Sequence, residues 1–497
     1  MAFSTWLIML LTHPNEFRTL LQYKLYYEPK RDLTAQEEHP TSGWDRETMR
    51  RCWAFLDLTS RSFSSVIKEL EGDLARGICM FYLVLRGLDT IEDDMTLDPA
   101  LKQSLLRNFH IHSTTPGWNF SGSGPDESDR QLLVEYQVVV EELNHLPASY
   151  RTCILDYCQK MGTGMADFAA RAENEKQSKY VERIADYELY CHYVAGIVGE
   201  GCSILFSASG KESPHLAEQL ELSNSMGLLL QKTNITRDFA EDVDEQRYFW
   251  PREIWGDARY GGFERPEDMR TPPPGTLALP GVQDRAVWVL NAMVLDALRH
   301  TTDALDYLRM LKNQSVFNFV AIPATMSIAT LELCFMNPKV LNQNVKIRKA
   351  MAASLIMRST NPREVAHIFR DYARKISARA VAQDPNFIRI SVACGKIEQW
   401  CERYYPSFVM ISASAQGGIQ QRINPSDARG ATFLEAEKRE NERTSRARLE
   451  KLVAAGRKPA VEDDGALRTF AMYFVGGTMM FLGVLAAVVY FITQLED

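Results

Sequence analysis

The sequence predicts an all-α protein, a single large helical bundle followed by a C-terminal membrane-spanning helix. From about residue 46 to 410, apolar residues recur every three or four positions and long alternating strand patterns are missing. Several predicted helices, such as Ile78–Leu85 and Met226–Leu230, are apolar nearly all round. Such helices are typical of the centre of a large bundle. The membrane helix is predicted by an uncharged apolar stretch close to the C-terminus.

Composition narrows the class of protein. Hydrophobic residues make up 45% of the 497 residues and charged residues 24%, which is ordinary for a globular chain. The formal net charge of -8 argues against a nucleic-acid binder. The nine cysteines form no CxxC pair and are odd in number, so we expect free, mostly buried thiols in a reducing compartment.

Breaks in composition divide the chain into segments. The composition changes from about residue 412 to 466. Within this segment, residues 435–458 are rich in Glu, Lys and Arg, which predicts a solvated helix or a flexible tether. The predicted segments are a lead-in (1–45), a helical domain (46–410), a charged flexible linker (411–468), a transmembrane anchor (469–493) and a short tail (494–497).

A first acidic cluster ends the apolar helix that starts near Ile78. Asp89 and Asp93 are four residues apart and Glu92 is three residues after Asp89, so all three carboxylates face the same way on a helix. Aligned carboxylates on a mostly buried face repel one another, so a positive partner is expected between or opposite them.

A second cluster repeats this arrangement after another apolar helix. Asn234, Asp238 and Asp242 lie at positions i, i+4 and i+8, which predicts one stripe along a helix, and Gln231 extends it backward. Each cluster alone could be a solvated acidic helix end. Two clusters with interleaved arginines, Arg86 and Arg237, favour instead a clamp that holds a diphosphate through bridging Mg²⁺.

The stretch 470–492 holds 23 residues without a charge, and about 20 apolar residues suffice to cross a bilayer. Arg457, Lys458 and Arg468 precede it, and Glu496 and Asp497 follow it. Only five residues follow this stretch, which predicts a tail anchor. The positive-inside rule places the long N-terminal part in the cytosol. An apolar patch from Phe3 to Leu11 lacks the basic region and cleavage site of a signal peptide.

Six sequence blocks together resemble the squalene/phytoene synthase family, and within it the squalene synthases. The similarity spans roughly residues 30 to 400. The blocks, in chain order, are SRSF (60–63), FYLVLRGLDTIEDDM (81–95), YCHYVAGIVGEG (190–201), MGLLLQKTNITRDFAED (226–242), NQSVFNF (313–319) and VKIRK (345–349).

The resemblance implies a bundle of the isoprenoid synthase type with a central cavity, and makes 46–410 the catalytic domain. It implies head-to-head condensation of two farnesyl diphosphates to presqualene diphosphate, then NADPH-dependent rearrangement to squalene, the first committed step of sterol biosynthesis. It further implies an endoplasmic reticulum membrane protein, with other sterol-pathway enzymes on the same membrane as candidate partners.

The resemblance also assigns candidate site residues. Tyr190 matches the tyrosine of the first half-reaction, although a neutral tyrosine is a poor base. The implied roles are: Mg²⁺ ligands Asp89, Glu92, Asp93, Asp238 and Asp242; diphosphate contacts Arg61, Arg86, Gln231 and Arg237; cofactor contacts Arg61, Arg86, Asn234, Lys346 and Arg348; and aromatic lining Phe63, Phe317 and Phe319.

Other interpretations stay open from the residues alone. Lys346 and Arg348 could form a solvated basic turn, and the three phenylalanines could be core aromatics. The glycine pattern Gly162-Thr-Gly164 has no preceding strand, so a Rossmann site is rejected. Asn234 begins a glycosylation sequon, which requires the domain to stay cytosolic. The competing functions are a phytoene- or dehydrosqualene-type synthase without reduction and an inactive, membrane-tethered helical interaction protein.

Overall fold

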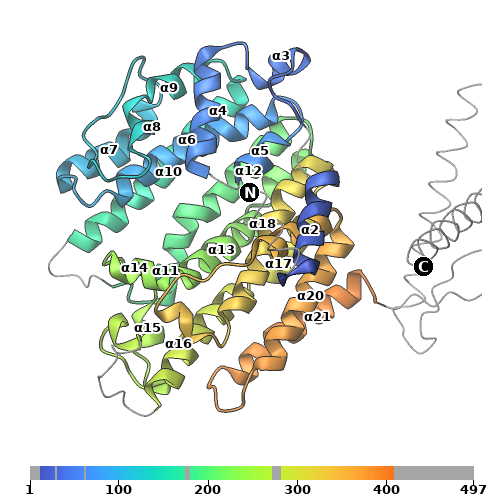
Figure 1. The fold of residues 1–497 in the computed structure, drawn as a ribbon. Helices are drawn as coiled ribbons and strands as arrows, with labels where there is room; N and C mark the ends of the chain where they lie inside the picture. The colour runs from blue at the N-terminus through green and yellow to red at the C-terminus, as the bar shows by residue number, and fades with distance from the viewer. Residues whose placement is uncertain (1–11, 28–30, 61–62, 174–179, 271–280, 408–497) are drawn as a thin grey trace, which may run out of the picture. The chain divides into compact units, whose positions relative to one another are not determined.

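The computed structural model describes residues 12–27, 31–60, 63–173, 180–270 and 281–407. All regular elements among these residues are helices, which confirms the all-α class (Figure 1). Residues up to Ser407 form one compact unit. The predicted linker and anchor lie outside the described residues, as does Arg61.

The α-helices are α2 (Pro14–Tyr26), α3 (His39–Ser42), α4 (Glu47–Ser60), α5 (Phe63–Lys68), α6 (Leu74–Asp93), α7 (Pro99–His112), α8 (Arg130–Val134), α9 (Gln137–Asn144), α10 (Ala148–Glu173), α11 (Ile184–Cys191), α12 (Ile197–Ala208), α13 (Leu220–Arg237), α14 (Phe239–Asp244), α15 (Arg252–Trp255), α16 (Val282–Leu298), α17 (Thr301–Met310), α18 (Gln314–Cys334), α19 (Lys349–Arg358), α20 (Pro362–Arg379) and α21 (Phe387–Tyr404).

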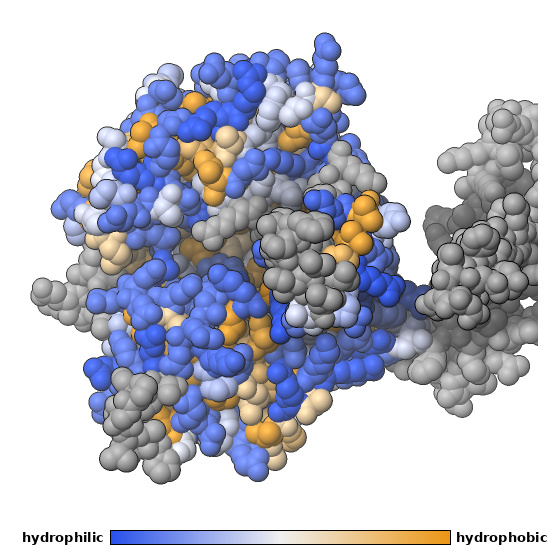
Figure 2. Space-filling view, viewed as in Figure 1, coloured by the Kyte–Doolittle hydropathy of each residue, from blue (hydrophilic) through white to orange (hydrophobic). Residues whose placement is uncertain are grey.

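The helices that carry the two acidic clusters lie in the interior, as their apolar sequences predict. α13 contacts α12, α16, α17 and α18 and runs through the middle of the bundle (Figure 1). α6 is buried along most of its length and packs against α4 and α10. The face drawn in Figure 2 is hollowed between the part that carries α7 and α8 and the part that carries α14, and apolar atoms are visible inside the hollow.

A π-helical turn, His192–Gly196, joins α11 to α12. Small residues let this stretch lie directly against α13. A Cβ on Gly199 would meet the Ser223 carbonyl, and one on Gly227 would meet the Ala195 carbonyl. Neither position has room for a larger side chain, because the facing backbone would have to move away.

Two described segments are long and apolar enough to cross a membrane by length and composition alone, Ile184–Ala208 and Gln314–Cys334. In the second, 61% of the most apolar window is buried inside the bundle, so its hydrophobicity is explained by the core. The thiols behave as expected, since all nine cysteines are free and all but Cys202 are buried.

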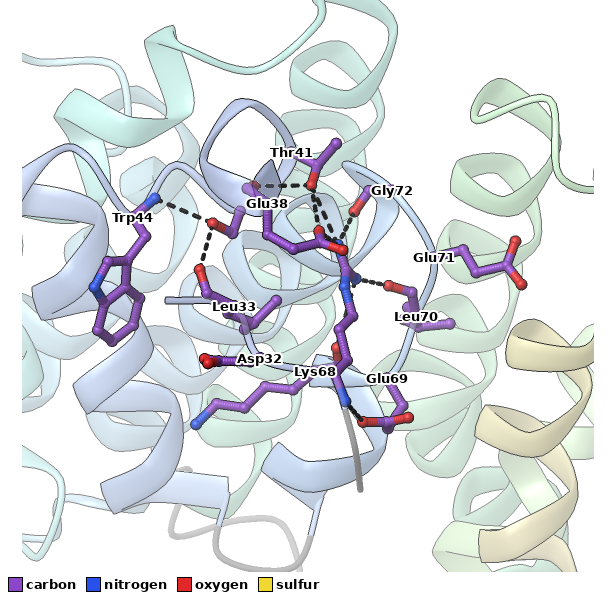
Figure 3. Close-up of polar contacts among 12 residues, drawn as sticks. Asp32, Leu33, Glu38, Thr41, Trp44, Lys68, Glu69, Leu70, Glu71 and Gly72 are labelled. Carbon is purple, nitrogen blue, oxygen red and sulfur yellow. Dashed lines mark hydrogen bonds and ion pairs between the residues drawn. The ribbon is translucent and has the colours of Figure 1, made fainter. Parts of the chain in front are cut away.

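The lead-in contributes to the fold through Arg31, whose side chain is only 12% exposed. Its guanidinium donates to the carbonyls of Leu70 and Gly72 and pairs with Glu38 at 2.7 Å (Figure 3). Its backbone N–H donates to Glu69 at 3.0 Å. These contacts fix the turn that joins α5 to α6, the helix of the first cluster.

We expect Arg31→Ala to lower the free energy of unfolding by about 2 kcal/mol, because partly buried carbonyls and Glu38 lose their charged donor. Thermal or urea unfolding of the purified chain measures the effect. Arg50→Ala is the matched control. Arg50 is exposed, and among the residues that the structure describes its side chain bonds just the nearby carbonyls of Trp44 and Asp45. Its loss should therefore change stability by about 0.5 kcal/mol or less.

Candidate active site

The first acidic cluster forms the last turn of α6. Asp89, Glu92 and Asp93 all lie within the helix, which ends at Asp93 and has no basic residue in its last turn. Carboxylates are disfavoured there, because the C-terminal end of a helix already carries partial negative charge. The unfavourable free energy of placing these carboxylates at the end of the helix must therefore be offset by cations from elsewhere in the fold.

The second cluster differs from the predicted continuous stripe. α13 ends at Arg237, Asp238 stands at the junction, and α14 begins at Phe239. The Asp238 N–H still donates to the Asn234 carbonyl, and the Asp242 N–H donates to the Asp238 carbonyl, both at 2.9 Å. The four-residue spacing therefore survives the interruption, and the carboxylates stay on one side.

Arg247 joins the two clusters. Its guanidinium donates to Asp93 at 2.7 Å and to Asp242 at 3.1 Å. A carboxylate from each cluster therefore lies within hydrogen-bond reach of one side chain, as the prediction of facing clusters requires. The sequence reasoning missed Arg247, although it follows the second cluster by only five residues.

The carboxylates repel one another and lie in a partly dry environment. Burial raises the pKa of Asp89 to about 7 and that of Asp242 to about 7, even though Arg86 and Arg247 oppose the shifts. Burial and the neighbouring Asp93 and Asp89 raise the pKa of Glu92 to about 8. The site therefore holds excess negative potential near neutral pH, which a divalent cation would relieve.

These shifts predict how stability varies with pH. A carboxyl whose folded pKa exceeds its unfolded value of about 4 stabilises the fold at low pH, and that contribution is lost as pH rises through the folded value. For Asp89, Asp242 and Glu92 the window runs from about pH 4 to 8. Metal-free protein should therefore lose thermal stability between pH 5.5 and 8, and Mg²⁺ should restore more of it at pH 8 than at pH 5.5.

Thermal scans in EDTA and in Mg²⁺ at both pH values test this expectation. Asp89→Asn should flatten the pH dependence of the metal-free protein, since one raised carboxyl is removed. An equal response to Mg²⁺ at the two pH values would contradict the linkage.

The two interleaved arginines are engaged with carboxylates of their own cluster. Arg86 lies 3.6 Å from Asp89 and 3.7 Å from Asp129, and also donates to the Tyr82 hydroxyl at 3.2 Å. Arg237 donates two bonds to Asp238, at 2.7 and 2.6 Å. Gln231 and Asn234 lie on α13 before this pair, and Asn234 is exposed.

Tyr190 lies beside the first cluster, at the end of α11. Its ring stacks on Phe249 with centroids 5.0 Å apart, and Phe168 meets it edge-on at 5.3 Å. Burial and the nearby carboxylates of Glu92 and Asp93 raise its pKa well above the usual value. Tyr190 therefore stays neutral at physiological pH.

The predicted aromatic residues separate into two positions. Phe63 of α5 and Phe319 of α18 meet edge-on with centroids 6.2 Å apart, and Phe206 packs on Phe319 at 5.8 Å. Phe317 lies two residues before Phe319, so the two side chains leave the helix in widely different directions. Phe317 is buried, whereas Phe63 is 36% exposed.

The basic segment that contains Lys346 and Arg348 begins at the second cluster. Asn344 donates to Asp238 at 2.6 Å and to Glu241 at 2.8 Å, which fixes the start of this segment. Arg348 pairs with Glu16 of α2 at 2.7 Å, and Lys346 is exposed. The sequence reasoning missed Asn344, although it immediately precedes VKIRK.

The residues suit magnesium without forming a closed metal cage. Within the described ranges no three His, Cys, Asp or Glu side chains converge on one metal position. Magnesium usually keeps several waters and takes one or two carboxylates plus phosphate oxygens, so complete protein coordination is not required. The raised pKa values of the two clusters are the observation that supports the fit.

Comparison with known proteins places these features in a family. Residues 56–350 match the squalene/phytoene synthase family. The chain is 59% identical to the squalene synthase of Ganoderma lucidum, over 91% of this chain and 96% of that protein. It is 47% identical to the squalene synthase of Schizosaccharomyces pombe, over 79% and 81% of the two chains. A solved structure of TcSQS with the ligand BPH1237 is similar with a TM-score of 0.66 and 39% identity, covering 72% of this chain and 99% of that one.

Proposed function

The chain belongs to the squalene/phytoene synthase family, and from this premise we propose that it is a squalene synthase. It joins two farnesyl diphosphates head to head to presqualene diphosphate and then converts this intermediate reductively to squalene. The observation that carries the proposal is the pair of hydrogen bonds from Arg247 to Asp93 and to Asp242. These bonds support one diphosphate-binding position between the two acidic clusters.

Mg²⁺, when bound, would supply charge that makes diphosphate a better leaving group. Asp89, Glu92 and Asp93 would hold it from α6, and Asp238 and Asp242 would hold it from the other side. Arg86 and Arg247 would contact the diphosphate oxygens directly and hold the substrate in place as charge develops on the leaving group. Arg61, Gln231 and Arg237 are proposed as further diphosphate contacts, on the resemblance alone.

Tyr190 acts as a neutral group in this proposal. Its raised pKa makes it a poor proton acceptor, so its ring and hydroxyl orient the allylic chain and stabilise positive charge on it. The departing diphosphate accepts the proton that is lost when the cyclopropane closes. The rings of Phe63 and Phe319 would line the path of the second half-reaction, where the face of an aromatic ring stabilises a cation without reacting with it.

NADPH, when bound, would supply the hydride. Lys346 and Arg348 fit its phosphate groups, because both are exposed and Asn344 anchors their segment to the second cluster. Asn234 of α13 is exposed and lies four residues before Asp238, the residue to which Asn344 donates. The cofactor thus binds through scattered polar and basic residues, with no Rossmann fold.

Replacing Lys346 and Arg348 together by alanine should let presqualene diphosphate accumulate and should lower squalene yield about 10²-fold at limiting NADPH. The reason is that a charge-assisted contact to a phosphate contributes about 1.5–3 kcal/mol. Chromatography of products from labelled farnesyl diphosphate measures both species. Lys375→Ala with Arg363→Ala, two exposed residues of α20, is the control. An unchanged ratio of squalene to presqualene would contradict the cofactor role.

We further propose that residues 469–493 anchor the chain in the endoplasmic reticulum membrane with the catalytic unit in the cytosol. The decisive experiment incubates the full chain in neutral detergent with labelled farnesyl diphosphate and Mg²⁺, with and without NADPH. Squalene that forms only with NADPH supports the proposal. Dehydrosqualene or phytoene-type products with NADPH present would indicate a synthase without reduction, and no pyrophosphate release would indicate an inactive interaction protein.

A further inference from the structure

A groove distinct from the acidic clusters lies between α16 and α21, which pack against each other. It consists of two adjoining cavities of about 350 and 180 Å³ that share Leu295, Arg299 and Arg389. The larger volume falls in the range of ~300–1,000 Å³ that is usual for ligand pockets. We call this feature the α21 groove.

The larger cavity combines an apolar floor with basic side chains and has no carboxylate in its lining. Its floor comes from Leu295 and Leu298 of α16 and from four residues of α21, and Arg299, Arg389 and Lys396 stand at its edge. This combination fits a ligand that has both an apolar chain and a negative head group.

The positive charge of Arg299 is already balanced by two neighbouring carboxylates. It pairs with Asp296 at 2.8 Å and with Glu188, and the fully buried Lys232 also holds Asp296, at 2.7 Å. Arg389 and Lys396 differ, because both are exposed and neither side chain makes an ion pair or hydrogen bond within the described part of the chain. They lie two turns apart on one face of α21, about 10 Å along its axis.

The carboxylates of the smaller cavity are engaged elsewhere. Asp257 accepts from Arg259 at 2.7 Å, and Glu253 accepts from the Ile184 N–H at 2.8 Å. Neither of these carboxylates forms a hydrogen bond with Arg389 or Lys396 of α21. Arg389 and Lys396 therefore remain available to an external anion.

Exposed apolar side chains accompany these cations. Ile388 is 73% exposed and Val392, one turn later, is 52% exposed. A Cβ added at Gly395 would meet nothing within 4 Å, so this part of the surface is open. Adjacent basic and apolar side chains on one exposed helix face are typical of helices that lie in the interface of a membrane.

The sequence indicates which kind of ligand binds the α21 groove. The uncharged stretch 470–492 predicts a membrane anchor, and α21 is the last described helix before the chain continues toward that stretch. A tethered domain meets the membrane surface at high effective concentration. We propose that the α21 groove docks on anionic phospholipid, with head-group phosphate at Arg389 and Lys396 and an acyl chain against Ile388, Val392 and the apolar floor. This inference rests on the predicted anchor and does not require catalytic turnover.

The test uses the full chain in bilayer discs made of phosphatidylcholine alone or with one lipid in five replaced by phosphatidic acid. Amide hydrogen exchange of peptides from residues 387–404 should slow several-fold in the anionic discs. Arg389→Gln with Lys396→Gln should abolish the slowing. Val392→Asp should also abolish it while leaving both cations in place.

Arg107→Gln with Lys160→Gln, on α7 and α10, removes the same charge away from the groove and should keep the slowing. Equal exchange in both kinds of disc, or slowing that survives in the Arg389 and Lys396 variant, overturns the inference. Inorganic phosphate added to phosphatidylcholine discs should have no effect; slowing by phosphate alone would show a free-anion site and overturn the lipid assignment. Squalene formation measured on the same samples separates failure of docking from failure of the proposed function.

Discussion

Asp89→Asn and Asp238→Asn should each reduce formation of presqualene diphosphate by about 10³-fold. Both changes keep the size of the side chain and remove a charge that would hold Mg²⁺ against the leaving diphosphate. Loss of one group that stabilises developing charge typically costs 10²–10³ in rate, and loss of a metal ligand also weakens metal binding. Pyrophosphate release and product chromatography at saturating Mg²⁺ measure the effect.

The thermal stability of the Asp89 and Asp238 variants serves as the control, because it separates a loss of catalysis from a loss of folding. Asp89→Asn removes a repelling carboxylate, so this variant should not melt below the metal-free parent at pH 8. Asp238→Asn also removes the ion-pair partner of Arg237, so this variant should melt somewhat lower. Asp98→Asn is a matched change outside the clusters, because Asp98 caps α7 by accepting from the Leu101 N–H at 3.0 Å. Because asparagine caps a helix about as well as aspartate, this change should alter stability by about 0.5 kcal/mol or less and leave turnover unchanged. Near-normal turnover in both cluster variants would overturn the assignment of the metal site.

Arg247→Met should reduce turnover about 10²-fold and also destabilise the metal-free protein. The methionine retains volume but leaves Asp93 and Asp242 without their shared donor. The effect on melting temperature should grow as pH rises from 5.5 to 8, because the carboxyl of Asp242, whose pKa is about 7, becomes charged over that interval.

Arg247→Lys distinguishes charge from geometry. A lysine restores the positive charge but lacks the planar fork that contacts both carboxylates. It should recover most of the stability and only part of the activity. If Arg247→Met behaves like the parent in both assays at pH 8, the bridge between the clusters has no role in holding diphosphate.

The sequence was sufficient for those features that depend on neighbours within one or two helical turns. The helical class, the burial of the cysteines and the alignment of Asp89, Glu92 and Asp93 on α6 are all confirmed. Each follows from residue spacing and side-chain chemistry. The placement of the six sequence blocks in one fold follows from the family, which the comparisons show.

The features that were missed depend on contacts between distant parts of the chain. Arg247 reaches Asp93 across 154 positions, and Asn344 reaches Asp238 across 106. No local pattern encodes either contact. The bond between Arg237 and Asp238 shows a related limit, because adjacent residues do not face each other within a helix. This pair meets because α13 ends at Arg237, an interruption that helical periodicity gave no reason to expect.

The π-turn at His192–Gly196 has a consequence for chain length. This turn is wound more widely than an α-helix. It separates Tyr190, which lies beside the first acidic cluster, from Gly199, where the absence of a side chain lets α13 pack closely. If this turn rewound to ordinary α geometry with all its residues kept, one flank would rotate by about 100° relative to the other. Either the tyrosine ring or the glycine contact would then face the wrong way. Deletion of one residue from this turn should therefore be tolerated better than insertion of one, because the loss of the wide turn can absorb the deletion.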